Sequence, residues 1–169
     1  MPISSNKYKQ MSIKEFTKAA KIYDSGKSGI YEICKYDYPK VLTELKNTKF
    51  IVGDCENLPF EDESYDVIIC TNSFHHYPNP QDFFDSVYRV LRKGGRLILR
   101  DYTSSDLIVW LMNHIELPLA HLVGHGDVKI YKKEEYREML KKAGFRKMKV
   151  QAEEKFRCHI IAVKLQFAI

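Results

Sequence analysis

GDCENLPFEDESYDVIICTNSFHHYPNPQDFFDSVYRVLRKGGRLIL, residues 53–99, is the stretch that decides the fold. In order along the chain, it has the pattern of a strand end, an acidic loop, a strand, a polar loop, a helix, a glycine turn and a second strand. This order is an α/β crossover, so an α/β fold is expected. Open α/β sheets bind ligands at the carboxyl ends of their strands. The polar residues after each predicted strand therefore mark the expected ligand site.

Apolar periodicity predicts the individual elements of this stretch. The run YDVIIC is β-branched and apolar, which is typical of a strand buried in a parallel sheet. Lys93, Gly94 and Gly95 combine a cation with glycines, as helix ends do. The predicted elements are a strand at 49–53, an acidic loop at 56–64, a strand at 65–70, a helix at 80–92 and a strand at 96–101.

The flanking segments are predicted to be mostly helical. Residues 1–10 are polar and expected to fray, and Ser12 is the expected N-cap of a helix to Tyr23, with Glu15 as its capping-box partner. The other predictions are a breaker at 24–29, a helix at 30–46 containing Pro39, an apolar helical segment at 105–123 interrupted by Pro118, a helix at 132–143 ended by Gly144, and paired strands at 147–156 and 159–167. We expect one domain, 1–169, with N-terminal helices at 12–47 and an α/β part at 48–169.

Composition argues against several classes of protein. The net charge of +5 comes from scattered basic residues, which are typical of solvated helix faces rather than of a nucleic-acid site. The four cysteines form no C-x-x-C pair, so a zinc ribbon or a redox motif is not expected. No apolar run reaches the ~18 residues of a membrane span, and the N-terminus lacks a signal-peptide pattern. A cytoplasmic protein with no membrane span and no nucleic-acid partner is expected.

Two groups of polar residues follow the predicted strands. After the first strand, the carboxylate of Asp54 beside Cys55 either binds a ligand amine or hydroxyl or caps nearby amides. After the second strand comes TNSFHH, residues 71–76, whose His75–His76 pair acts as an acid or base, orients a substrate, or simply packs in a loop. Adjacent histidines in an extended loop point in different directions, so joint metal binding by this pair is not expected.

Two other motifs are less indicative of a functional site. His121 and His125 have the spacing of two helical metal ligands, but the glycines that flank His125 predict that the helix ends there. Exposed histidines at a helix end are therefore favoured, and no metal site is expected. The sequence has no G-x-G-x-x-G and no P-loop motif. Its Gly94-Gly95 pair lies between a helix and a strand, which is the reverse of a phosphate-binding loop.

Five segments together resemble the class I S-adenosylmethionine-dependent methyltransferases, most closely those related to the ubiquinone and menaquinone enzymes. The segments are FTKAAKIYD at 16–24, GDCENLPF at 53–60, YDVIIC at 65–70 with His75-His76, LRKGGRL at 91–97 and KAGF at 142–145. Their order is that of the family, and they cover nearly the whole chain. The resemblance implies a Rossmann-like sheet with flanking helices and S-adenosylmethionine as cofactor.

The resemblance also implies roles for individual residues. Asp54 corresponds to the residue that binds the adenine amino group, and Cys55 to one that offers its backbone amide to the ring. Thr71 and Asn72 would lie beside the methionine part of the cofactor, and Tyr23 would cover it from the N-terminal helix. His75 and His76 would lie near the transferred methyl group, with His76 as the candidate catalytic residue. Such enzymes work mainly by aligning a nucleophile with the methyl group.

The chain departs from the family pattern at one junction. Leu45–Phe50 runs directly into Ile51–Asp54, where the family has a D-x-G-x-G-x-G loop and two strand–helix units of on the order of 50–60 residues. The expected sheet is therefore missing two central strand–helix units. A gap in the sequence, a genuine deletion, or strands supplied by a partner chain would each explain this junction.

The function expected from the resemblance is S-adenosylmethionine-dependent methyl transfer to a small molecule. A second hypothesis is a non-catalytic remnant that acts as a binding or assembly module. Nucleic-acid binding is disfavoured because arginines and aromatic residues are not interleaved on one face. The apolar segment at 105–123 suggests either a hydrophobic acceptor or a helix packed on the core. Exposed sheet edges favour a homodimer.

Overall fold

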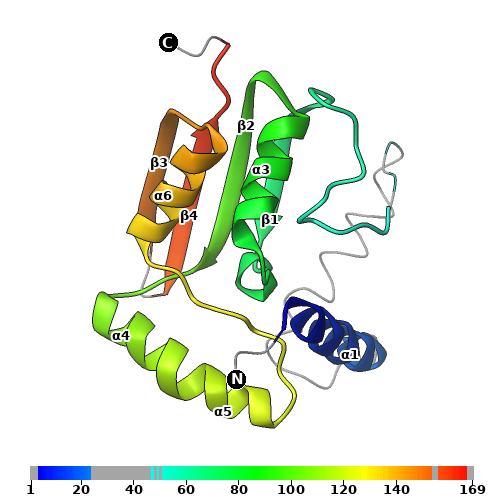
Figure 1. Ribbon diagram of the computed structural model, residues 1–169, viewed down its shortest axis with the longest axis vertical. Helices are drawn as coiled ribbons and strands as arrows, with labels where there is room; N and C mark the ends of the chain where they lie inside the picture. The colour runs from blue at the N-terminus through cyan, green and yellow to red at the C-terminus, as the bar shows by residue number, and fades with distance from the viewer. Residues whose placement is uncertain (1–3, 24–46, 48, 50, 154–155, 167–169) are drawn as a thin grey trace.

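The computed structural model describes residues 4–23, 47, 49, 51–153 and 156–166, without the side chains of residues 16 and 18–23 (Figure 1). The predicted breaker at 24–29 and helix at 30–46 lie outside these residues. The elements are α1 (Ser5–Tyr23), β1 (Tyr65–Thr71), the 3-10 turn η1 (Phe74–His76), α3 (Pro80–Val90), β2 (Leu91–Tyr102), α4 (Asp106–Leu111), the π-helical turn η2 (Met112–Glu116), α5 (Leu117–Leu122), α6 (Lys133–Ala143), β3 (Lys147–Glu153) and β4 (Arg157–Val163).

The described strands form one mixed sheet in the order β1-β2-β4-β3. β1 and β2 are parallel and are connected by α3, which is the predicted crossover. β4 is antiparallel to both β2 and β3, so the predicted C-terminal strand pair is confirmed. The α/β fold class is confirmed as well.

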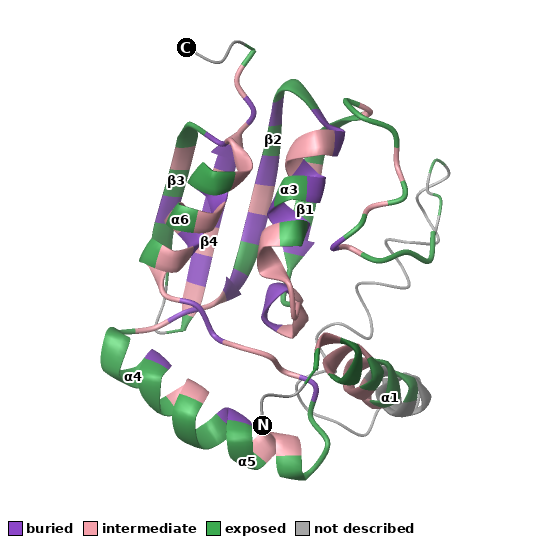
Figure 2. Cartoon of the chain, viewed as in Figure 1, coloured by how far each residue is buried: buried purple, intermediate pink, exposed green. Residues whose placement is uncertain are grey.

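The molecule has two main layers, with a group of helices at one end. α3 and α6 lie side by side on one face of the sheet, and α1, η1 and the α4–α5 segment lie at the end where β1 and β2 finish (Figure 1). Burial alternates along the strands, so one sheet face is packed and the other is open in the described part of the chain (Figure 2). The packed face and its two helices bury Leu97, Leu99, Ile160, Phe84, Tyr136 and Phe145 completely. This arrangement leaves the carboxyl ends of the parallel strands for the candidate site.

β1 is less buried than its sequence predicted. Of its apolar side chains only Cys70 is buried, while Val67 and Ile69 are exposed. The YDVIIC run predicted a strand covered on both faces, but β1 is an edge strand of the described sheet. Its outward side chains point to the open face, which none of the helices described here covers.

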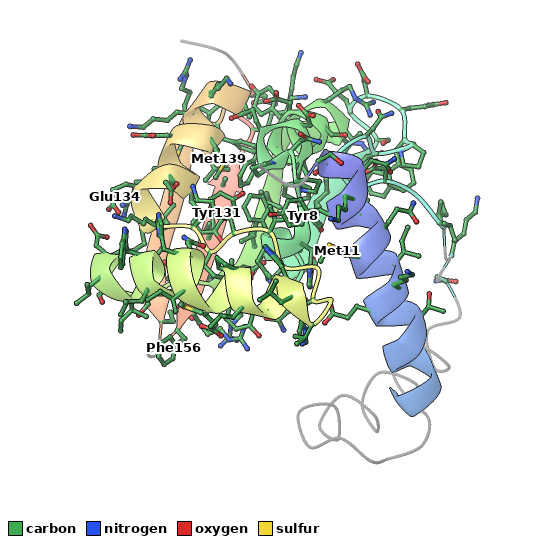
Figure 3. All side chains as sticks on the ribbon, turned by 60° about the horizontal axis from the view of Figure 1, so that its bottom comes forward. Tyr8, Met11, Tyr131, Glu134, Met139 and Phe156 are labelled. Carbon is green, nitrogen blue, oxygen red and sulfur yellow. The ribbon has the colours of Figure 1, made fainter. Side chains whose placement is uncertain are left out.

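α1 begins seven residues before the predicted start. Ser12 and Glu15 lie inside the helix, and both bind the distant loop at Gly126 instead of capping α1: Ser12 Oγ donates to the Gly126 carbonyl (3.3 Å), and the Gly126 N–H donates to Glu15 (2.9 Å). The polar first turns are stabilised by tertiary contacts. Tyr8 points from α1 toward the body of the molecule and packs edge-on against His121 at the end of α5 (Figure 3).

The strand predicted at 49–53 is wrong for the residues that the structure describes there. Residues 49 and 51–53 have no regular secondary structure, and Ile51 and Val52 are exposed. Asp54 makes only an isolated bridge with Asn57. An apolar run becomes a strand only beside a partner strand, and none of the described strands pairs with this run.

The helix-ending turn predicted around Gly94 is instead a bulge within β2. α3 ends at Val90, two residues earlier than predicted, and the chain enters β2 directly. The register between β1 and β2 jumps here, from Tyr65↔Leu91 to Val67↔Arg96. Gly94 has a φ of +83°, and its N–H donates to the carbonyl of Lys164 (2.7 Å). Glycine serves the bulge because this backbone conformation strains other residues.

The segment 105–123 is helical, and Pro118 does not interrupt it. The π-helical turn η2 precedes Pro118 and widens the helix where the proline ring and its missing N–H disturb the hydrogen-bond ladder. Val109 and Leu117 are buried against Ile130, which attaches the segment to the rest of the molecule. No helix in the described part of the chain is both long and apolar enough to cross a membrane.

Gly144 is expected to be sensitive to substitution. It ends α6 as predicted, with a φ of +110°, and an added Cβ would lie 2.9 Å from the Tyr88 ring. Gly144→Ala should destabilise the protein by about 1–3 kcal/mol, measured by thermal or urea unfolding. Gly124→Ala is the control, because Gly124 also has a positive φ but an added Cβ would meet nothing within 4 Å. Equal effects in the two variants would exclude a contribution from the Tyr88 contact.

Candidate functional site

A pocket of about 670 Å³ lies between α1, the loop before β1 and the turn after β1. It is lined by Lys9, Ser12, Ile13, Thr17, Gly53, Asp54, Cys55, Glu56, Ser73, His76, Tyr77 and Pro78. Its volume falls in the range of about 300–1,000 Å³ that is common for small-molecule sites. The pocket lies at the carboxyl end of β1, where ligands bind to open α/β sheets.

The acidic side of the pocket is organised around Lys9. Its ammonium group lies 2.7 Å from Asp54 and 2.8 Å from Glu56, and it therefore joins α1 to the loop. Glu56 is buried, and both of its oxygens accept hydrogen bonds from Asn79. The hydrogen bond from Lys9 lowers the pKa of Asp54, while the two carboxylates raise the pKa of Lys9. Asp54 is therefore ionised at neutral pH and presents a carboxylate to the pocket.

A small network of hydroxyl and thiol groups forms another part of the pocket. Tyr77 Oη lies 3.0 Å from Ser73 Oγ and 3.7 Å from Cys70 Sγ. Burial raises the pKa of the Cys55 thiol and raises that of Cys70 to about 11. Both thiols are protonated at neutral pH, so neither is poised as a nucleophile, and Cys55 serves as a weakly polar part of the pocket wall.

The His75–His76 pair differs from its predicted geometry. The two residues lie in the 3-10 turn η1 and not in an extended loop, and their ring centroids are 4.2 Å apart. The expectation that they point in different directions is therefore wrong, because the tighter turn brings both rings to Asp127. His75 Nε2 lies 3.4 Å and His76 Nδ1 lies 3.3 Å from the same Asp127 oxygen.

A buried carboxylate fixes His75. Asp101, at the end of β2, is completely buried, and its Oδ1 accepts a hydrogen bond from His75 Nδ1–H (2.6 Å). The backbone N–H groups of His75 and Tyr102 also donate to this carboxylate. Burial and the neighbouring His75 lower the pKa of His76, so His76 is neutral near pH 7.

The loop that carries Asp127 is held from several sides. The Val128 N–H donates to the His75 carbonyl (2.7 Å), and His121 Nε2 contacts the Asp127 carbonyl at 2.5 Å. Glu15 of α1 binds His125 in the same loop at 2.8 Å. His121 and His125, which have the spacing of helical metal ligands in the sequence, make separate contacts instead: His121 with the Asp127 carbonyl and His125 with Glu15.

The structure brings some of the predicted site residues together and separates others. Asp54, Cys55 and His76 line the pocket. His75 is hydrogen-bonded to Asp101 and does not line the pocket. Thr71 and Asn72 are exposed and do not line it either. Asn72 accepts a hydrogen bond from Arg157 (2.6 Å). The side chain of Tyr23 lies outside the described residues.

Sequence reasoning missed Lys9, Asp101 and Asp127. Asp101 ends a strand whose neighbour ends at the histidine loop, so the strand-end rule used for Asp54 would have identified it. Lys9 was placed in a frayed terminus, and Asp127 follows a helix end with no motif of its own. Neither had a local signal, because both act through contacts distant in sequence.

Comparisons with known proteins show that the fold is similar to that of methyltransferases. Residues 25–99 match the family model described as a methyltransferase domain. Phthiotriol/phenolphthiotriol dimycocerosates methyltransferase 1 of Mycobacterium ulcerans is 42% identical over 79 residues, covering 46% of this chain and 29% of that protein. The crystal structure of YcgJ from Bacillus subtilis is similar, with a TM-score of 0.61 and 18% identity, over 77% of this chain and 76% of that chain.

A ligand-bound structure shares the fold as well. Phosphoethanolamine N-methyltransferase 2 of Haemonchus contortus, solved with phosphomonomethylethanolamine and S-adenosylhomocysteine, has a TM-score of 0.54 and 16% identity, covering 67% of this chain and 36% of that chain. In motifs, sequence match and fold, the chain resembles the class I S-adenosylmethionine-dependent methyltransferases. The chain spans about a third of the length of the curated relatives that it matches.

The similarity to methyltransferases implies S-adenosylmethionine as the methyl donor, and the pocket residues fit such a molecule. The donor has an adenine amine, ribose hydroxyls and a cationic sulfur. Asp54 offers an ionised carboxylate, and the side chains of Ile13, Cys55 and Pro78 form apolar parts of the pocket wall. Lys9 occupies one oxygen of Asp54, while the other oxygen accepts a hydrogen bond from the Glu56 N–H. A bound amine would therefore share this carboxylate with Lys9.

Proposed function

We propose that this chain binds S-adenosylmethionine in the α1 pocket and transfers its methyl group to a small apolar molecule. The observation that carries the proposal is the convergence of separate family motifs on one cavity. Asp54 and Cys55 come from GDCENLPF, His76 from the loop after YDVIIC, and Thr17 from the N-terminal helix. These positions span 60 residues of sequence, and folding brings all of them to the wall of one cavity of about 670 Å³.

In this proposal the protein binds the cofactor mainly through the loop at 53–56. The Asp54 carboxylate accepts a hydrogen bond from the adenine amine, and the Cys55 backbone amide faces the ring. Thr71 and Asn72 begin the loop that carries Ser73 into the pocket and would lie beside the methionine part. The roles of Tyr23 and His75 beside the cofactor stay predictions from the family resemblance.

His76 is the proposed catalytic residue. S-adenosylmethionine supplies an electrophilic methyl group on a sulfonium centre. His76 lines the pocket, and its lowered pKa leaves a neutral imidazole that can accept a proton from an acceptor hydroxyl. Holding the acceptor in line with the methyl group contributes most of the rate in this kind of reaction.

An apolar acceptor is supported by the α4–α5 segment. Its outward side chains are largely apolar, with Leu107, Trp110, Ile115, Leu119 and Leu122 exposed. Tyr8 on α1 contacts His121 of this segment, so the segment adjoins the helix that lines the pocket. The name of the M. ulcerans relative contains a long-chain lipid, phthiotriol dimycocerosate, which is consistent with an apolar acceptor.

Calorimetric titration with S-adenosylhomocysteine tests the proposal. The parent chain should bind, and Asp54→Ala should weaken binding by about 10- to 100-fold, because a hydrogen bond to a charged group contributes about 1.5–3 kcal/mol. Asp62→Ala is the matched control, since Asp62 lies in the same loop, pairs with Arg89 and is mostly exposed. It should bind as the parent does.

Two results would count against the proposal. Absence of binding by folded parent protein would favour the second hypothesis, a non-catalytic remnant used for binding or assembly. Equal affinity of the Asp54→Ala variant would exclude Asp54 as an adenine ligand. The homodimer, the cytoplasmic location and the single-domain organisation stay predictions, and sedimentation of the purified chain would test the first of them.

A further inference from the structure

Three potential metal ligands converge beside the pocket, at η1 and the loop after α5. They are His75 Nε2, His76 Nδ1 and a carboxylate oxygen of Asp127, and they all lie within 4.8 Å of one another. Both histidine side chains are close to buried, and Asp127 is about one quarter exposed. The three groups come from two segments that are 50 residues apart in sequence.

The two distances from Asp127 match the geometry of a tetrahedral metal site. Zinc bound by histidine nitrogen and carboxylate oxygen at about 2.0–2.1 Å separates neighbouring ligand atoms by about 3.3–3.4 Å in a tetrahedron. The separations from Asp127 Oδ1 are 3.4 Å to His75 and 3.3 Å to His76. Both are longer than the usual range of about 2.7–3.2 Å for an N–H···O hydrogen bond.

The hydrogen bond on the other side of His75 determines which nitrogen faces Asp127 with a lone pair. Because Nδ1–H donates to Asp101 at 2.6 Å, the neutral ring has its lone pair on Nε2. That lone pair faces a carboxylate oxygen at 3.4 Å, and a cation bound between them would relieve the repulsion between the two electron-pair donors.

The groups around the three ligands are arranged as in zinc sites. A metal-bound histidine usually donates its second N–H to a carboxylate, which fixes the ring and raises its basicity. Asp101 is in this position, fully buried and bound by two backbone N–H groups in addition to the ring. Asp127 is held by the contact of His121 with its carbonyl and by the adjacent Val128 N–H.

We infer that His75, His76 and Asp127 bind a divalent transition-metal ion of the zinc type, with Asp101 as the positioning residue for His75. Two histidines and one carboxylate are a ligand set that zinc accepts, and three protein ligands leave a fourth position for water or another oxygen ligand. His76 also lines the α1 pocket, so the ion would lie at the pocket wall. The inference does not depend on methyl transfer, because it concerns binding of the ion itself. With the ion on Nδ1, His76 has no lone pair left to accept a proton, so the proton-accepting role proposed above belongs to the metal-free protein.

Cobalt(II) titration of chelator-treated full-length protein tests the site. The expected result is binding of one ion per chain with the visible absorption bands of four-coordinate cobalt, and displacement of those bands by zinc. Asp127→Ala and His76→Gln should abolish the bands. His114→Gln is the matched control, since His114 stacks on Trp110 in the α4–α5 segment and should leave binding unchanged.

Asp101→Asn tests the positioning role separately. It keeps the three ligands and should weaken cobalt binding by about 10- to 100-fold, as loss of such supporting groups does at known sites. The melting temperature of each variant, recorded without metal, separates loss of the site from loss of the fold.

A measurement on the unaltered protein keeps the inference testable if variants fail to fold. Zinc should shift the ring nitrogen and proton NMR signals of His75 and His76 and leave those of His114 in place. Absence of cobalt bands in the parent, or bands that survive both ligand substitutions, would overturn the inference.

Discussion

Phe74→Ala is expected to lower the free energy of unfolding by about 3–5 kcal/mol, the range for removing a buried phenylalanine side chain. Phe74 is completely buried and is the centre of an aromatic cluster. Its ring lies 5.0–5.5 Å from the rings of Tyr77, Phe83, Phe84, Tyr131 and Tyr136. Thermal unfolding should show a fall in melting temperature of roughly 10 °C.

The effect of this change should extend to the candidate site. Phe74 precedes the histidine pair in η1, so its ring holds the turn that places His75 and His76. Phe156→Ala is the control, because Phe156 is exposed and projects from the surface (Figure 3). It should change stability by less than about 0.5 kcal/mol. Similar losses in the two variants would contradict the central role of Phe74.

Asp101→Ala is expected to cost about 3–5 kcal/mol, because leaving each buried hydrogen-bond donor without its acceptor costs about 1–3 kcal/mol. The change removes the acceptor for three donors at once: the His75 ring, the His75 N–H and the Tyr102 N–H. No water can replace the carboxylate easily, because Asp101 has no exposed surface. Urea unfolding monitored by circular dichroism measures the loss.

Asp66→Ala provides the matched control for the buried aspartate. Asp66 pairs with Arg92 at 2.6 Å, but its side chain is mostly exposed, and exposed pairs contribute about 0–1 kcal/mol. The difference between the two variants therefore measures the effect of burial on one residue type. An unchanged urea midpoint in Asp101→Ala would show that His75 is held by its surroundings and not by the carboxylate.

Local sequence signals were sufficient for the elements that make their own contacts. α6 and α3 have strong apolar periodicity, and the β3–β4 pair is adjacent in sequence. Their type was predicted correctly, and the errors are confined to their ends. The glycine bulge of β2 was mistaken for a turn because a bulge and a helix end both favour glycine at a positive φ.

Elements that depend on distant partners were predicted poorly. The run at 49–53 has strand composition but no described partner strand, while the polar start of α1 is helical because of contacts with residues more than 40 positions away. The same reasoning applies to the site. Asp54 and His76 were chosen as candidates because they follow predicted strands, whereas Asp127 is brought to the histidines by a loop that only the folded chain closes.

The open face of the sheet affects how copies of this protein behave in solution. Across three strands it carries a row of isoleucines, Ile69, Ile98 and Ile161, which are neighbours in the strand register. Exposed cations lie on both sides of the row, including Arg96 and Lys149. Two such faces would adhere through the isoleucines, but their like charges repel at low ionic strength. The screening length of charge interactions falls from about 8 Å at physiological salt to about 3 Å at 1 M, which weakens this repulsion. We therefore expect aggregation through this face to increase with salt, and concentrated stocks are best kept in dilute buffer.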